Sequence, residues 1–124
     1  MLPDFLVPEI VVRESGESKP LDCSEYLNSN LLLTLVITHA VERESLELVI
    51  LGSDDGRDWD VVPLLRVPPK NYCGTYNIPL PSLNSRYIKA AWRARRWGLG
   101  DQRPFFRFHI FAKSAPAFAV AGAA

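Results

Sequence analysis

The sequence lacks the long apolar segment that a membrane-spanning helix requires. Its longest apolar run, at residues 31–37, is far shorter than the roughly 20 residues that a bilayer-crossing helix needs. The first eight residues contain two prolines and an acid, and they lack the basic start and apolar stretch of a secretory signal. We therefore expect a soluble chain, cytoplasmic or associated with a larger particle, with no signal peptide and no membrane span.

Sequence motifs of common enzymes are also missing. There is no Gly-x-Ser-x-Gly nucleophile turn, no phosphate-binding Gly-x-x-x-x-Gly-Lys and no dinucleotide-binding Gly-x-Gly-x-x-Gly. The two histidines, His39 and His109, lie on different predicted strands, and no cysteine–histidine cluster has the spacing of a zinc site. We expect a non-catalytic protein with no cofactor.

Cysteine is scarce, with Cys23 and Cys73 as the only two. Two cysteines without a visible secretory signal favour reduced thiols, because disulfides persist mainly in oxidising compartments. Unpaired cysteines are usually buried and pack as small apolar groups. We therefore expect both thiols to be free and buried, with a Cys23–Cys73 disulfide as the alternative.

Helical periodicity is absent, and ten prolines and seven glycines interrupt the chain. Short runs rich in Val, Ile, Leu, Phe and Tyr recur instead, which is typical of half-buried strands. We predict a single all-β domain over 1–124, an antiparallel, jelly-roll-like β-sandwich of about seven to eight strands with little or no helix. Residues 1–19 form an N-terminal arm with the first strand, and 114–124 form an apolar C-terminal tail. The predicted strands are Phe5–Arg13, Asn30–His39, Ser45–Ser53, Trp59–Val67, Tyr72–Ile78, Arg86–Arg93 and Pro104–Ala112.

Side-chain alternation assigns the faces of the last two predicted strands. Phe105 and Phe111 fall on the face opposite to the predicted core face of the last strand, so this strand is apolar on both sides. Such a strand is either covered on both sides or presents an aromatic surface to a partner. We expect coverage by the protein's own loops or tail. The residues predicted to face the core are Ile88, Ala90, Trp92, Phe106, Phe108 and Ile110.

A pattern in the middle of the chain has a known counterpart. Residues 53–59 read Ser-Asp-Asp-Gly-Arg-Asp-Trp after a predicted strand, and residues 86–89 read Arg-Tyr-Ile-Lys in a later one. Aspartate and Gly56 suit a tight hairpin turn, since glycine accepts a positive φ. Over about residues 31–112 this order resembles discoidin-like, galactose-binding-like jelly-roll domains, and similar hairpins occur in β-sandwich modules of bacterial surface and phage tail proteins. The resemblance implies a jelly-roll fold and a carbohydrate- or other ligand-binding module. The family's N-terminal ligand-binding loops have no counterpart in this chain, so no binding residue is carried over.

The same hairpin carries four acids, Asp54, Asp55, Asp58 and Asp60. Several carboxylates close together can coordinate calcium, because hard cations take oxygen ligands. Gly56 comes too early for the helix–loop–helix calcium pattern, and no glutamate closes the loop. We therefore interpret the cluster as a solvated hairpin tip, with a calcium site as the alternative.

An arginine-rich segment around Trp92 suits an anionic ligand. Arginine forms two-pronged contacts with phosphate, sulfate or carboxylate, and aromatic rings stack on bases or sugars. The sequence pI of 6.7 lacks the basic footprint of a nucleic-acid-binding domain, so nucleic acid is not the expected partner. The candidate ligand-binding residues are Trp97, Arg93, Arg95, Arg96, Arg103 and Arg107.

The net charge of zero hides an asymmetry between the two halves of the chain. Residues 1–60 contain thirteen acids and four bases, whereas residues 61–124 contain ten bases and one acid. Strands from the two halves can interleave and neutralise these charges, or a dipolar protomer can stack its acidic surface on a basic one. The main prediction is a structural or assembly module that packs against itself or a larger particle. The alternatives are a carbohydrate- or other ligand-binding module and a module that binds an anionic polymer.

Overall fold

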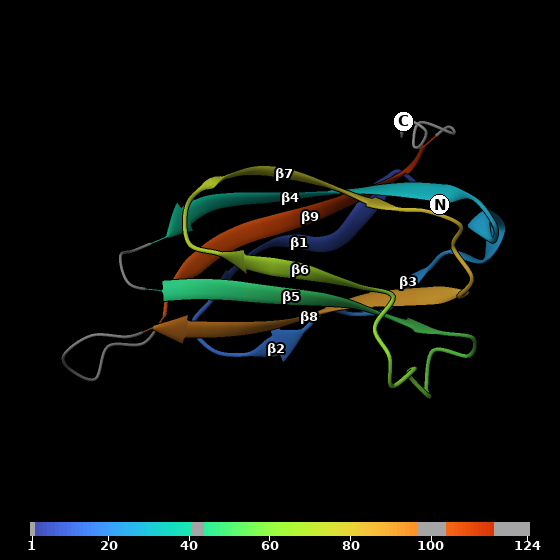
Figure 1. The fold of residues 1–124 in the computed structure, drawn as a ribbon, viewed down its shortest axis with the longest axis horizontal. Helices are drawn as coiled ribbons and strands as arrows, with labels where there is room; N and C mark the ends of the chain where they lie inside the picture. Colours follow the sequence, from blue (N-terminus) through green and yellow to red (C-terminus); the bar gives the residue numbers. More distant parts are fainter. Residues whose placement is uncertain (1, 41–43, 97–103, 116–124) are drawn as a thin grey trace.

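The computed structural model describes residues 2–40, 44–96 and 104–115, which form a sandwich of two antiparallel β-sheets (Figure 1). Within these ranges the helical structure is one 3-10 turn, η1 (Ser24–Tyr26), and no helix is long and apolar enough to cross a membrane. The strands are β1 (Asp4–Val12), β2 (Gly16–Glu17), β3 (Leu21–Asp22), β4 (Asn30–Ala40), β5 (Glu44–Ser53), β6 (Leu65–Lys70), β7 (Gly74–Leu80), β8 (Tyr87–Arg96) and β9 (Phe106–Ala115).

The strand order is that of a jelly roll. One sheet has the order β1-β9-β4-β7 and the other the order β2-β8-β5-β6, with β3 also paired to β8. Because β2 and β3 pair with successive parts of β8, they share one position, and the sandwich has eight strand positions. In both sheets every strand from residues 1–60 pairs with strands from residues 61–124. The prediction of an all-β, jelly-roll-like sandwich is confirmed.

Alternating side chains from both sheets fill the space between the layers. The six residues predicted to face the core from β8 and β9 are all buried. The Trp92 ring meets the Phe108 ring edge-on, with 5.5 Å between centroids, so this contact joins β8 in one sheet to β9 in the other. Gly16 lets β2 lie against the indole, since a Cβ at this position would stand 3.2 Å from the Trp92 ring.

Prolines within strands occur only in strands at the sheet edges. Pro8 lies in β1, Pro68 and Pro69 in β6, and Pro79 in β7, whereas the central strands β4, β5, β8 and β9 contain none. Proline has no N–H to donate to a neighbouring strand. The edges are therefore poor templates for pairing with a strand of another molecule.

The edge strands are also where the predicted boundaries are wrong. The predicted strand at 59–67 begins too early, because residues 59–64 form a loop and β6 runs through two prolines to Lys70. At an edge, β7 likewise continues through Pro79 to Leu80. Both β2 and β3 are absent from the predicted strands, since two residues are too few to show alternation.

The two cysteines differ in their surroundings. Both are free, as predicted, and Cys23 is buried, but Cys73 is exposed in the turn between β6 and β7, so the prediction of its burial is wrong. Burial raises the pKa of the Cys23 thiol to about 11, with the charge of Asp22 as a second cause. Cys23 therefore remains protonated and unreactive at neutral pH, and Cys73 is the accessible thiol.

Replacing Trp92 with alanine is expected to lower the free energy of unfolding by about 3–5 kcal/mol, because truncating a buried aromatic side chain leaves a cavity between the sheets. Arg95→Ala, on the same strand but exposed, is the matched control and should change it by less than about 0.5 kcal/mol. Urea unfolding followed by circular dichroism measures both variants. An unchanged unfolding midpoint for Trp92→Ala would contradict its place in the core.

Candidate functional site

The loops of the sandwich gather at the two ends of its long axis (Figure 1). The right-hand end in this view holds the β3–β4, β5–β6 and β7–β8 connections, and the left-hand end holds the β1–β2 and β6–β7 connections. We define the acidic end as residues 22–29, 54–64 and 81–86, and the basic end as the described residues 13–15, 44, 70–73, 95–96 and 104–106.

The acidic end has six acids against two bases, an excess of four negative charges. All eight side chains are exposed, so water solvates them. They are Asp22, Glu25, Asp54, Asp55, Asp58 and Asp60, with the bases Arg57 and Arg86.

The basic end has four bases against two acids, an excess of two positive charges. Arg107, near the start of β9, is not counted because it pairs with Glu9 on the side of the sandwich. The segments 41–43 and 97–103 lie outside the described residues, and each holds one acid and one base in the sequence. The charged residues of the basic end are Arg13, Lys70, Arg95 and Arg96, with Glu14 and Glu44.

Aromatic rings lie among the charges of the basic end. The Phe105 ring meets the His39 ring edge-on at 5.0 Å, and the Arg13 guanidinium carbon lies 5.7 Å from the centre of the Phe105 ring. Phe105 N–H also donates a hydrogen bond of 2.7 Å to the buried carboxylate of Glu44. The basic end is thus a surface of mixed aromatic and cationic character, anchored to β5 by a buried acid.

Between the two ends, acids of the first half of the chain meet bases of the second half. Lys89 Nζ lies 3.1 Å from Glu17 Oε1, and Arg107 Nε lies 3.1 Å from Glu9 Oε1. These pairs follow from the strand order, which alternates strands of the two halves. The interleaving interpretation of the charge asymmetry is therefore correct along the sheets, while the ends retain an excess of one sign.

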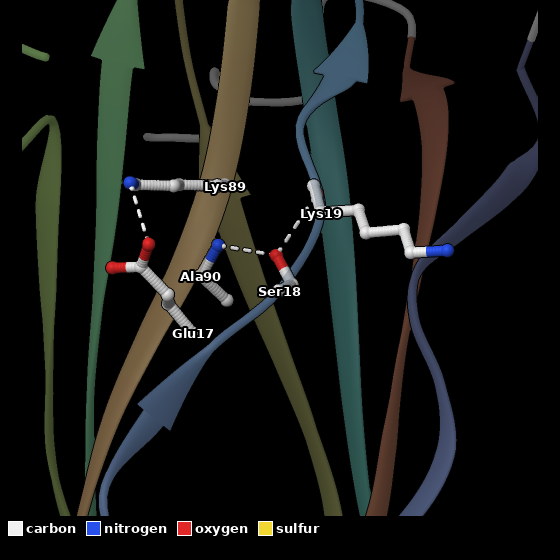
Figure 2. Close-up of polar contacts among 5 residues, drawn as sticks. All are labelled: Glu17, Ser18, Lys19, Lys89 and Ala90. Carbon is white, nitrogen blue, oxygen red and sulfur yellow. Dashed lines mark hydrogen bonds and ion pairs between the residues drawn. The ribbon is translucent and has the colours of Figure 1, made fainter. Parts of the chain in front are cut away.

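Figure 2 shows the polar contacts around Lys89 on the outer side of the five-stranded sheet. Alternation points Lys89 outward, yet the side chain is buried, because the Trp59 ring lies 4.3 Å from its Nζ and Glu17 pairs with it. Beside it, Ala90 N–H donates to Ser18 Oγ (2.9 Å), and Ser18 N–H donates to Ala90 O (2.8 Å). The Ser18 hydroxyl replaces a main-chain acceptor at the break between β2 and β3.

A groove of about 590 Å³ runs along this broken edge, between β1 and residues 17–21. Its lining includes the buried side chains of Leu6, Val7 and Trp92. Its charged members are Asp4, Glu9, Glu17 and Lys19. Size and lining are within the range of small-ligand sites, which are mostly apolar with a few polar groups.

The second apolar face of β9 is partly covered by its neighbour β1. Phe5 packs edge-on against His109 and Phe111, with ring centroids 5.8 and 5.2 Å apart, and is itself 45% exposed. The expected cover by loops or tail thus comes in part from an adjacent strand, while the tail at 116–124 lies outside the described residues.

The predicted arginine set does not form one surface. Arg93 and Arg95 are exposed on β8 in the five-stranded sheet, whereas Arg107 lies on β9 in the other sheet and pairs with Glu9. Arg96 is half-buried at the end of β8. Trp97 and Arg103 lie outside the described residues.

The predicted hairpin tip is confirmed. Ser53 Oγ accepts hydrogen bonds from the N–H groups of Asp55 (3.2 Å) and Gly56 (2.9 Å), and its one hydrogen can be donated either to Asp58 O (2.7 Å) or to Asp55 Oδ1 (3.0 Å). Gly56 has a φ of 77°, the left-handed geometry that glycine accepts most readily. The turn after β5 is therefore held by a buried serine at its base.

The four aspartates of the predicted calcium alternative are exposed around this turn. The Asp55 carboxylate accepts hydrogen bonds from Arg57 N–H (2.8 Å) and Asp58 N–H (2.9 Å), so it serves the turn itself. In the part of the chain that the structure describes, no three Asp, Glu, His or Cys side chains come together as metal ligands.

Sequence reasoning missed Val61 and Val62, which it places in a strand. They are the most exposed large apolar residues of the acidic end, at 96% and 76%. The signal that could have revealed them is their position between an acid and Pro63, since proline and charge interrupt a strand.

No protein-family model matches the chain, and no curated protein matches it in sequence. The function is therefore inferred from the charges, surfaces and loops of the chain itself.

Hydrogen bonds from Arg57 N–H, Asp58 N–H and the Ser53 hydroxyl, in that order, hold the pKa of Asp55 below its usual 3.8. Because the folded pKa is depressed, this stabilisation is present above the ordinary pKa and is lost as pH falls through the folded value. An NMR titration should give a lower midpoint for Asp55 in the protein than in an unfolded peptide of residues 53–59. Equal midpoints would contradict the carboxylate's role in the turn.

Proposed function

We propose that this chain is a non-catalytic structural module that assembles end to end, with copies of itself or on a larger particle that offers a matching surface. The observation that carries the proposal is the opposite charge of the two ends, an excess of four acids at one and two bases at the other. Complementary potentials attract and orient two surfaces before they touch. Head-to-tail contacts of this kind generate rings or filaments.

The sides of the sandwich support this choice by offering fewer routes to association. Prolines in β1, β6 and β7 hinder the addition of a strand from another molecule at those edges. Along the sheets, ion pairs such as Glu17–Lys89 and Glu9–Arg107 already neutralise charges within the protomer. Exposed charges such as Lys19 also lie along the sheets, whereas the two ends carry opposite excesses of charge.

Light scattering coupled to size-exclusion chromatography tests the proposal. At 0.1 M salt the protein should have a mass above that of the protomer, and the mass should fall at 1 M salt, because the screening length drops from about 10 Å to about 3 Å. Asp58→Lys with Asp60→Lys, and separately Arg13→Glu with Arg95→Glu, should each prevent association. Mixing the two variants should restore it, since each keeps one native end that complements the other.

Lys19→Glu is the matched control, because it reverses an exposed charge on the side of the sandwich rather than at an end. It should associate like the natural protein. A natural protein that stays monomeric at both salt concentrations would contradict self-assembly.

A ligand-binding module of the discoidin-like type is a second candidate, favoured by the groove of about 590 Å³ beside β1. A ligand that binds the folded state raises the melting temperature, by an amount set by its concentration relative to Kd. A thermal-shift screen of carbohydrates with and without calcium should find such a ligand, and Lys19→Ala should reduce the shift while Lys113→Ala should not. No shift with any carbohydrate would contradict this candidate.

A further inference from the structure

Two neighbouring valines are exposed to solvent at the acidic end. Val61 is 96% exposed and Val62 is 76% exposed. Single exposed apolar residues are ordinary on protein surfaces, but this pair is contiguous and follows a run of acids. An apolar centre with a charged rim is the usual composition of a protein–protein contact.

The structure holds the two valines in a fixed position. On one side Asp60 N–H donates to Gly52 O (2.9 Å), and on the other Leu64 N–H donates to Ile50 O (2.8 Å), so β5 anchors both flanks of residues 61–63. The Trp59 ring packs over Lys89 on the sheet. Because the loop is already anchored, less conformational entropy is lost when a partner covers the valines.

The opposite end offers a complementary surface. Phe105 lies there beside Arg13, and Tyr72 is 77% exposed in the β6–β7 turn, two residues after Lys70 in the sequence. Aromatic rings can cover the valines, and the bases around them can pair with Asp58 and Asp60. Both the apolar and the charged parts of the acidic hairpin thus have counterparts at the basic end.

We infer that the loop at residues 59–64 of one copy docks on the basic end of the next copy. Val61 and Val62 pack against the aromatic rings there, and Asp58 and Asp60 face its arginines. This inference rests on the proposed end-to-end assembly and names the contact that makes it.

Affinity measurements separate the valine contact from the general attraction of the ends. Val61→Ser with Val62→Ser should weaken self-association by at least about tenfold at 0.1 M salt, because two buried valine side chains account for more than one tenfold step in affinity. At 1 M salt, where the ends no longer associate, the melting temperature should not fall, since both residues are exposed in the protomer. Val11→Ser, at an exposed apolar residue on the side of the sandwich, is the control and should leave association unchanged.

Cross-linking tests the direction of the contact. Cys73 is an exposed thiol at the basic end and Cys23 is buried, so Val62→Cys adds one reactive thiol at the opposite end. With a short bis-maleimide the full chain should form a ladder of covalent oligomers at 0.1 M salt. Adding Cys73→Ser should reduce the ladder to dimers at most, and Lys19→Cys in place of Val62→Cys should give no ladder.

The outcomes distinguish the two proposals. Salt-dependent association that the valine variant leaves unchanged would overturn the docking of this loop and leave end-to-end assembly standing. A natural protein that never associates would overturn both. Binding of heparin by a monomeric protein, lost in Arg13→Glu with Arg95→Glu, would also overturn both and identify an anionic polymer as the occupant of the basic end.

Discussion

The pairing of each strand from the first half of the chain with strands from the second half is the constraint on which the structure depends. Strands of the two halves alternate in both sheets. The order is β1-β9-β4-β7 in one sheet and β2-β8-β5-β6 in the other. The first half is acidic and the second basic, so the ladder places unlike charges side by side. Like charges directly opposite one another destabilise a strand pair. The charge asymmetry therefore favours this topology over pairing within either half.

The same constraint explains why charge accumulates at the ends. A ladder brings opposite charges together only while two strands run side by side, and the pairing stops where the chain turns. The β3–β4 and β5–β6 connections carry most of the acids that remain, and they emerge at one end. Four bases, Arg13, Lys70, Arg95 and Arg96, lie at the other end, where β1, β6 and β8 finish. A neutral chain thus folds into a molecule with a charge dipole along its long axis.

Period-two alternation was sufficient to predict the central strands and their core faces. In β8 and β9, apolar residues such as Ile88, Trp92 and Phe108 occupy every second position, so they all point to the same face of the strand. It was insufficient at the edges, where β6 and β7 tolerate prolines that usually end a strand. Lys89 shows another limit of alternation, which predicts an outward and exposed side chain. The side chain is buried because the Trp59 ring packs over it and Glu17 pairs with it.

The candidate site was less accessible to sequence reasoning than the fold. The arginines around Trp92 are close in sequence, but alternation and the crossing from one sheet to the other separate Arg93 from Arg107. The opposite charge of the two halves is visible in the sequence, whereas its location at the ends depends on which loops share an end. That information exists only once the strand order is known.

The proposed end-to-end contact also fits the energetic limits of a small sandwich. Exposed charges attract weakly through water, so charge alone gives orientation and a salt-dependent encounter more than affinity. An apolar contact must supply the rest of the binding free energy. Among the described residues of the acidic end, Val61 and Val62 are the most exposed apolar side chains. Because β5 anchors both flanks of their loop, the valines are presented without a large ordering cost. In the proposed contact, charge selects the end of the partner that is bound, and the fixed pair of valines holds the two copies together. Such a contact is specific in direction and reversible with salt.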